Sequence, residues 1–384
     1  MLFFLCFITN YSFAKPFRFF ISTILSKNLS LYIEIMNMRL FKVGLIVILI
    51  SSCSNKTVQE SLLTIDTLLQ NKADTLLTTS MIEHQATSGK AIIMETATGY
   101  IKAMVGLERK DTLSPFQPTT DFCTPYPTEQ RQIATLLAAL ETGKISLSDT
   151  VDVGEGIYIS DSDTIKDHNW HRGGYGKITV EWAIAASSRI GEVLIRERAF
   201  DDNKSEYEAA IGQIGYGKPD SVKGLDCILN TDVAASKISP IQLITFYNAI
   251  ANHGRMVQPQ LYKDSVAIIN PQIASKANID SIRQVLERTV AEGLGKRVNT
   301  NKAKVAGKGG TIQIGNPNDS TYIIDFCGYF PTDNPRYTIL VVLEKQELPA
   351  SGHIQAAGLF RKIVEQLIPV SYTHLRAHET TLHI

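Results

Sequence analysis

The stretch Val305–Gly315 reads VAGKGGTIQIG and sets Lys308 among glycines, with Thr311 shortly after it. Glycines around a lysine, with a hydroxyl nearby, are typical of loops whose backbone N–H groups hold phosphate. A Walker-type loop places a glycine at the position taken here by Lys302 and a hydroxyl at the position of Gly309. The spacing therefore excludes a phosphate loop, and Lys308 needs another explanation.

Metal and nucleic-acid chemistry have little support. His168 and His171 are close in sequence, but the other histidines are dispersed, so we interpret this pair as part of a polar loop. Five cysteines are too few and too scattered for a disulfide framework. The 38 basic and 38 acidic residues cancel, which leaves no electrostatic footprint for nucleic acid. We expect no metal, no cofactor and no nucleic-acid partner.

The pattern of residues 61–368 predicts one continuous mixed α/β domain. Ser61–Glu83 has helical spacing, Lys90–Val105 reads as two strands of a hairpin, and residues 120–300 are mostly helical. Strands and a final helix follow in 305–315, Thr321–Gly328, Tyr337–Glu344 and Ala356–Leu367. Strands near both ends with helices inserted between them indicate an antiparallel sheet built from both ends of the domain.

A lipoprotein signal precedes this domain. Met38–Lys42 is basic, Val43–Ile50 is apolar, and the run ends in Ile50-Ser51-Ser52-Cys53, which resembles a bacterial lipobox. The resemblance implies cleavage before Cys53 and lipid on its thiol and new amino terminus. A plain membrane anchor is the alternative, but the apolar run is too short to span a bilayer comfortably.

The two outermost segments are expected to lie outside the domain. Residues 1–35 precede the signal of residues 36–53, and we interpret them as translation from a start codon placed too early, with the true start at Met36 or Met38. Residues 371–384 have no apolar period and resemble the translation of a sequencing adapter. We expect this tail to be non-native and without ordered structure.

Six blocks of the domain carry a family resemblance, and they appear in the family's order. They are LTIDTLLQNKADTLL, AIIMETATGYIKAMV, LLAALETGKI, GYGKITVEWAIAASSRIGEVLI, ISPIQLITFYNAIANHGRMVQPQL and GYFPTDNPRYTILVVLE, within a signature that runs from Leu63 to Leu367. They resemble the transpeptidase domain of the penicillin-binding proteins, closest to class B. The resemblance implies an α/β (α+β) fold of the penicillin-binding-protein and serine β-lactamase type, with an antiparallel sheet, flanking helices and a helical subdomain. It also implies acyl transfer through a serine ester.

That chemistry uses an S-x-x-K motif, in which the lysine accepts the proton of the serine hydroxyl. Counting back from LLAALETGK places the family's P-G-S-T-F-K-P on Pro127–Ile133, so the nucleophile position is Glu129 and the base position is Gln132. A glutamine accepts no proton at neutral pH, and a glutamate attacking a carbonyl gives only an anhydride. An S-x-x-K match occurs at Ser12–Lys15, ahead of the signal. The first motif is therefore expected to be inactive.

The second and third motifs also depart from the family. The S-x-N motif falls on Ser187-Ser188-Arg189, where a guanidinium that cannot accept a hydrogen bond replaces the amide. In the K-T-G motif, which is expected to bind the substrate, Lys308, Gly310 and Thr311 are retained and Gly309 replaces the hydroxyl. We expect Glu129 to lie within about 4 Å of Arg189 or Lys308, because a partly buried acid left alone is costly.

The sequence thus predicts a penicillin-binding-protein-like lipoprotein that is catalytically inactive and acts in peptidoglycan binding or scaffolding. The alternative is an active D,D-transpeptidase or carboxypeptidase whose nucleophile is Thr128 or Ser187. A third possibility, a sensor acylated by β-lactams, needs the same serine and also a signalling segment that we do not find. Expected partners are a peptidoglycan stem peptide or β-lactam bound non-covalently, cell-wall synthesis proteins, and the membrane through the lipid. The expected location is the cell envelope, facing the periplasm.

Overall fold

The computed structural model describes residues 63–380, apart from 160–163, 226–228, 230–236 and 317–318. The chain divides into residues 1–62 and residues 63–384, and only the second unit is described below. The expected signal and Cys53 lie outside the described residues, so their assignment stays a prediction. Within residues 63–380, less those gaps, no helix is both long and apolar enough to cross a bilayer.

One antiparallel sheet organises the domain, as the sequence predicts. Its strand order is β12-β13-β14-β1-β2-β3, with every neighbouring pair antiparallel. Strands from the beginning and the end of the domain meet where β1 pairs with β14, and β12 forms one edge. The bounds are β1 Ser88–Glu95, β2 Ile101–Glu108, β3 Gln117–Pro118, β12 Ala306–Asn316, β13 Asp319–Phe330 and β14 Tyr337–Lys345.

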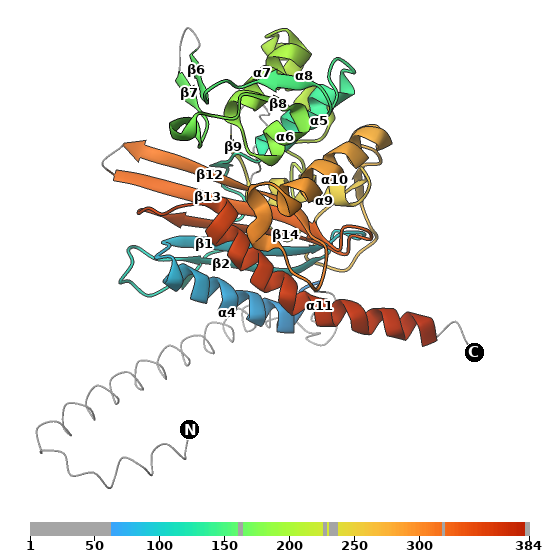
Figure 1. The fold of residues 1–384 in the computed structure, drawn as a ribbon. Helices are drawn as coiled ribbons and strands as arrows, with labels where there is room; N and C mark the ends of the chain where they lie inside the picture. Colours follow the sequence, from blue (N-terminus) through green and yellow to red (C-terminus); the bar gives the residue numbers. More distant parts are fainter. Residues whose placement is uncertain (1–62, 160–163, 226–228, 230–236, 317–318, 381–384) are drawn as a thin grey trace, which may run out of the picture. The chain divides into compact units, whose positions relative to one another are not determined.

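The two faces of the sheet pack into separate apolar cores, because successive side chains of a strand point to opposite faces. In β1, Ala91 and Ile93 belong to one buried cluster, whereas Ile92 and Met94 belong to the other. Helices α4 (Thr67–Glu83) and α11 (Ala357–Thr380) cover the first face (Figure 1). This alternation fixes the register, since a slip of one residue would exchange the two cores.

The other face carries the helices that hold the candidate site, which Figure 1 shows as a layer above the sheet. These helices are α5 Arg131–Glu141, α6 Val180–Ala185, α7 Arg189–Phe200, α8 Lys204–Gln213, α9 Pro240–Ala251 and α10 Lys276–Ala291. Short strands connect them: β4 Tyr126–Pro127, β5 Thr150–Asp152, β6 Ile157–Ile159, β7 Thr164–Lys166, β8 Lys177–Thr179, β9 Lys237–Ile238, β10 Met256–Val257 and β11 Ile268–Asn270. Every residue of α9 is buried, and Ser239 and Gln242 form a capping box at its start.

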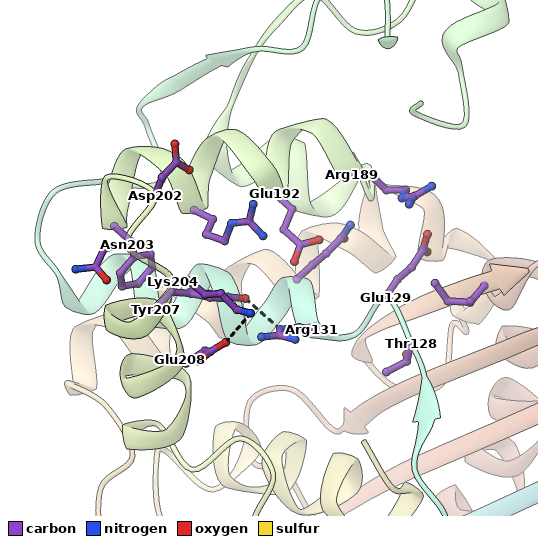
Figure 2. Close-up of a pocket in the computed structure, with 14 residues that line it drawn as sticks. Thr128, Glu129, Arg131, Arg189, Glu192, Asp202, Asn203, Lys204, Tyr207 and Glu208 are labelled. Atoms are coloured by element: carbon purple, nitrogen blue, oxygen red, sulfur yellow. Dashed lines mark hydrogen bonds and ion pairs between the residues drawn. The ribbon is translucent and has the colours of Figure 1, made fainter. Parts of the chain in front are cut away.

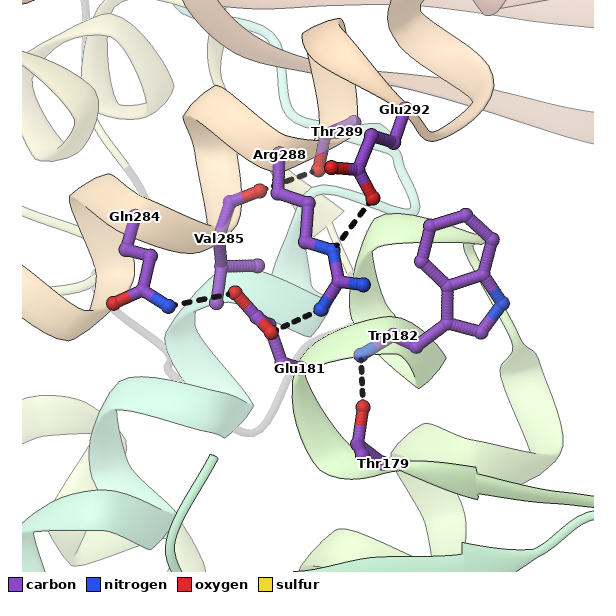
Figure 3. A network of polar contacts seen from close by, with 8 residues as sticks. All are labelled: Thr179, Glu181, Trp182, Gln284, Val285, Arg288, Thr289 and Glu292. Atoms are coloured by element: carbon purple, nitrogen blue, oxygen red, sulfur yellow. Dashed lines mark hydrogen bonds and ion pairs between the residues drawn. The ribbon is translucent and has the colours of Figure 1, made fainter. Parts of the chain in front are cut away.

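A polar network ties α6 to α10 and so positions the chain that follows α6 (Figure 3). The Arg288 guanidinium contacts the Glu181 carboxylate, donates to Glu292 at 3.2 Å and lies over the Trp182 ring at 5.2 Å. Gln284 donates to the same Glu181 at 2.9 Å. Because α6 ends just before Ser187, these contacts help to fix the second motif position.

The end of the chain differs from the prediction. Helix α11 begins at Ala357, as expected, but continues to Thr380. The expectation that residues 371–384 are without ordered structure is therefore wrong for residues 371–380. A helix that is already nucleated by packed turns extends readily, because each added residue contributes one further hydrogen bond.

Candidate active site

The edge strand β12 and the start of α5 bring the first and third motif positions together. In the register of β12 with β13, Lys308 lies opposite Cys327 and Gly310 lies opposite Asp325, so these four residues share one face. That face meets α5, because a Cβ added at Gly310 would lie 3.4 Å from the Cβ of Glu129. The two motifs are thus adjacent, as the sequence comparison implies.

Glu129 lies directly against the edge strand. Its Oε2 accepts a hydrogen bond from the backbone N–H of Thr311 at 3.1 Å. Burial raises the pKa of the Glu129 carboxyl, and the charge of Lys308, the Thr311 N–H and the charge of Arg189 oppose that rise. The expected ion pair is wrong: in the described chain Glu129 has no contact within 4.0 Å to a cationic side chain. The backbone N–H takes the place of the cation as its hydrogen-bond donor.

Gln132, at the position expected for the base, lies in the first turn of α5 and is 1% exposed. Neither Oε1 nor Nε2 of its amide has a hydrogen-bond partner among the described residues. A buried amide without partners costs on the order of 1–3 kcal/mol, and in Gln132 both the oxygen and the nitrogen of the amide are unpaired. The structure therefore places Gln132 beside Glu129 but gives it no protein group to act on.

Ser187 is the centre of a buried polar chain that also contains Lys308 and His353. Lys308 Nζ donates to Ser187 Oγ at 2.6 Å, and Ser187 Oγ lies 3.2 Å from His353 Nε2. Ser187 has φ 54°, in the left-handed region that β-carbon-bearing residues seldom adopt. Burial lowers the pKa of Lys308, with the charge of Glu129 opposing, and lowers the pKa of His353 well below its ordinary value. The imidazole is therefore neutral at neutral pH.

Arg189 starts α7 and is held through its backbone. Ser188 is the N-cap residue, and buried Asp167 accepts from Ser188 Oγ at 2.6 Å and from Arg189 N at 2.7 Å. The Arg189 side chain is exposed, and its guanidinium has no ion-pair or hydrogen-bond partner in the described chain. Arg189 thus presents an available cation at the surface of the site.

The structure explains why position 309 is a glycine, which the sequence alone did not. A Cβ at this position would lie 2.9 Å from the backbone N of His353 and 3.0 Å from the carbonyl carbon of Gly352. Both residues belong to a π-helical turn, η3 (Gly352–Ala356), which packs against β12. Gly352 N also donates to Thr311 Oγ1 at 2.9 Å. A side chain at position 309, such as the threonine of K-T-G, would therefore collide with this turn.

A second buried carboxylate, Asp325, was missed by sequence reasoning. It accepts from Thr128 Oγ1 at 2.5 Å and from Gln130 Nε2 at 2.7 Å, and burial raises its pKa. Gln130 Nε2 also donates to the Lys308 carbonyl at 2.9 Å, and its Oε1 accepts from the Tyr247 hydroxyl. This cluster fixes the start of α5 to β12 and β13. The sequence signal was an acid within an otherwise apolar strand.

A cleft of about 460 Å³ opens beside Glu129 (Figure 2). Helices α5, α7 and α8 form its walls, and β12 contributes Ile312. The charged and amide groups at its surface are Glu129, Arg131, Gln132, Arg189, Glu192, Arg196, Asp202, Asn203, Lys204 and Glu208. Ser187, Lys308 and His353 are not among the lining residues, so the cleft and the buried serine are separate features.

Comparisons with known proteins agree with this arrangement. Residues 89–365 match the penicillin binding protein transpeptidase domain. The chain is 24% identical over 327 residues to penicillin-binding protein PbpB of Mycolicibacterium smegmatis, covering 72% of this chain and 49% of that protein. It is 26% identical over 258 residues to stage V sporulation protein D of Bacillus subtilis, covering 59% and 38%. The chain thus spans half or less of the length of these relatives.

Solved structures show the same fold. The transpeptidase domain of Burkholderia pseudomallei penicillin-binding protein 3 superposes with a TM-score of 0.67 at 22% identity, covering 81% of this chain and 96% of that domain. Penicillin-binding protein 2B of Streptococcus pneumoniae superposes with a TM-score of 0.69 at 16% identity, covering 81% and 59%. The predicted fold class, an antiparallel sheet with flanking helices and a helical subdomain, is confirmed.

Proposed function

The chain belongs to the penicillin-binding protein transpeptidase domain family, and we propose that it is a member that does not form an acyl-enzyme. In this proposal it acts in the cell envelope as a non-covalent peptidoglycan-binding or scaffolding protein. The observation that carries the proposal is the hydrogen bond from Thr311 N–H to the Glu129 carboxylate at 3.1 Å. The residue at the expected nucleophile position is engaged with the edge strand and offers no hydroxyl.

The surroundings of Glu129 support the same conclusion. An ester-forming hydroxyl needs a base within hydrogen-bond reach, and the neighbouring position expected for that base is Gln132, whose amide accepts no proton. The Thr311 N–H, a backbone donor beside the expected nucleophile position, already donates to the Glu129 carboxylate and is not free to stabilise an oxyanion. Acyl transfer at this position therefore lacks a nucleophile, a base and a free donor.

Covalent labelling tests the proposal. The purified domain is incubated with a fluorescent penicillin, denatured and run on a gel, and we expect no labelled band. Glu129→Ser alone is the matched variant, and it is also expected to stay unlabelled because Gln132 provides no base. A labelled band from the natural sequence that survives denaturation would refute the proposal.

Ser187 is the second candidate, since a specific contact favours it. Its Oγ lies 2.6 Å from Lys308 Nζ, and burial lowers the pKa of that lysine, as a serine–lysine pair requires. Against it, Ser187 is 6% exposed and its hydroxyl already contacts both Lys308 and His353. Thr128 is weaker still, because its hydroxyl donates to Asp325. If penicillin labels the protein and Ser187→Ala abolishes the label, the active alternative is correct.

The proposed location is the cell envelope, with the domain in the periplasm and a lipid on Cys53. Disulfides persist in oxidising compartments and are rare in the cytosol, and Cys123 is disulfide-bonded. Radiolabelled palmitate is expected to enter the natural protein and not the Cys53→Ser variant. Equal labelling of the two proteins would remove the lipidation assignment.

A further inference from the structure

The cleft beside Glu129 contains polar groups that the fold leaves without partners. Gln132 has a buried amide with no hydrogen bond, although it lines the cleft. The guanidiniums of Arg189 and Arg196 have no ion pair or hydrogen bond within the described chain. Arg196 lies only over the ring of Tyr207, at 5.8 Å.

Several of the other charged groups of the cleft have partners within the protein, whereas Asp202 is exposed to solvent. Glu192 accepts from Thr135 Oγ1 at 3.0 Å. Arg131 donates to the Tyr207 hydroxyl at 3.1 Å, and Lys204 pairs with Glu208 at 3.6 Å. The guanidiniums of Arg189 and Arg196 and the amide of Gln132 are thus three groups without partners that line one cleft. They are the groups that a ligand would engage.

Their spacing follows from helix geometry. Arg189, Glu192 and Arg196 lie on one face of α7, at i, i+3 and i+7, and all three line the cleft. The two arginines start two turns apart, roughly 10 Å along the axis. An extended peptide covers that distance in about three residues. The acid between them would repel a third carboxylate but would accept a hydrogen bond from a peptide N–H.

We propose that this cleft binds a short acidic peptide that carries two carboxylates about three residues apart. One carboxylate pairs with Arg189 at the mouth and the other with Arg196, since guanidinium–carboxylate pairs are charge-assisted and frequently bidentate. A peptide amide between them engages Gln132. Phe200 and Tyr207 provide the apolar wall, with their rings in a T-shaped contact at 5.3 Å. This inference rests on the proposed non-covalent function and names the ligand class that it requires.

Calorimetry with defined peptides tests the inference. N-acetyl-Glu-Ala-Ala with a free carboxyl terminus has two carboxylates, N-acetyl-Gln-Ala-Ala has one, and N-acetyl-Gln-Ala-Ala-amide has none. We expect each lost carboxylate to weaken binding at least 5-fold. Equal affinity for the three peptides would overturn the inference, as would displacement of the peptide by equimolar inorganic phosphate, which indicates a simple anion site.

Variants of the arginines assign the contacts. Arg189→Ala and Arg196→Ala are each expected to lower the affinity for the dianionic peptide about 10-fold and to remove the preference for one of its carboxylates. Arg198→Ala is the matched control, because Arg198 lies on the same helix, outside the cleft, near Asp149 at 3.5 Å. An equal loss of affinity in Arg198→Ala would show a non-specific charge effect and refute the assignment.

Gln132→Leu tests the amide and should weaken binding at least 3-fold without unfolding the protein. Unchanged affinity in this variant removes the amide contact from the proposal. The outcome is independent of penicillin labelling. A labelled protein that binds the dianionic peptide contradicts the inactive site alone, whereas an unlabelled protein with no peptide affinity contradicts this inference alone.

Discussion

Two glutamines at the start of α5 have the same side chain and opposite environments. Gln130 is fully buried, donates to the Lys308 carbonyl and to Asp325, and accepts from Tyr247. Gln132 is 1% exposed and its amide has no partner in the described chain. Buried polar groups in folded proteins are nearly always hydrogen-bonded, so only the second glutamine requires an explanation beyond the fold.

The comparison distinguishes polar groups that stabilise the fold from polar groups that are left for a ligand. The network of Gln130 holds the helix that carries Glu129 against β12 and β13, and each of its atoms is used within the protein. Gln132 is held by the same helix but faces a cleft with two unpaired arginines. The proposed non-covalent ligand site needs both features, a helix held firmly by Gln130 and unpaired polar groups at the cleft.

Gln130→Leu should give the largest effect on stability. It removes the amide that contacts the Lys308 carbonyl and the Tyr247 hydroxyl, and it removes one of the two donors to the Asp325 carboxylate, all in a buried position. We expect a loss of about 3 kcal/mol in the free energy of unfolding, measured by urea denaturation. A loss below about 1 kcal/mol would show that water replaces the amide and that the two glutamines do not differ as described.

Gly309→Thr, which gives the family's K-T-G, should cause the next largest loss of stability. The new Cβ would lie 2.9 Å from the His353 backbone, which is too close without a shift of η3. We expect a loss of about 2 kcal/mol, in the range measured for overpacked sites. Gln313→Thr, at an exposed position of the same strand, is the control and should change stability little. If Gly309→Thr left the free energy of unfolding unchanged, η3 would be able to shift at little cost.

Much of the fold and the positions of the motifs could be predicted from the sequence. The side-chain contacts of the site could not, and the reason is physical. Runs of apolar residues predicted β1, β13 and β14 nearly to their ends, and the order of the motifs predicted that Glu129, Ser187 and Lys308 lie near one another. Contacts made by single side chains over long sequence distances were not predictable. His353 reaches Ser187 across 166 positions, and Asp325 binds Gln130 across 195. No local pattern encodes such pairs.

Gln132→Leu should change the free energy of unfolding in the opposite direction from Gln130→Leu. Replacing a buried amide without partners by an apolar group of similar size removes a desolvation cost, whereas no hydrogen bond is lost. We expect the free energy of unfolding to rise by about 1 kcal/mol, in the same urea assay. A destabilised Gln132→Leu would indicate that ordered water satisfies the amide, and the comparison between the two glutamines would then fail.

The smallest effect concerns Glu129 and its dependence on pH. Burial raises the pKa of this carboxyl above its ordinary value of 4.5, against the opposing influence of Lys308, the Thr311 N–H and Arg189. An acid whose pKa is higher in the folded state contributes stability fully below the ordinary pKa and loses that contribution as the pH rises through the folded value. Glu129→Gln removes this titration and keeps an amide oxygen that can accept from Thr311 N–H.

We therefore expect the stability of the natural protein to fall relative to Glu129→Gln as the pH rises above 4.5, because the folded-state pKa of the carboxyl lies above that ordinary value. Asp202→Asn, which removes an exposed acid of the same cleft, is the control and should show no such trend. The opposite slope, with the natural protein gaining on the variant as the pH rises, would mean that the cations outweigh burial. Glu129 would then be held as a carboxylate by Lys308 and Arg189 at a distance, and the charge complementarity expected from the sequence would operate without direct contact.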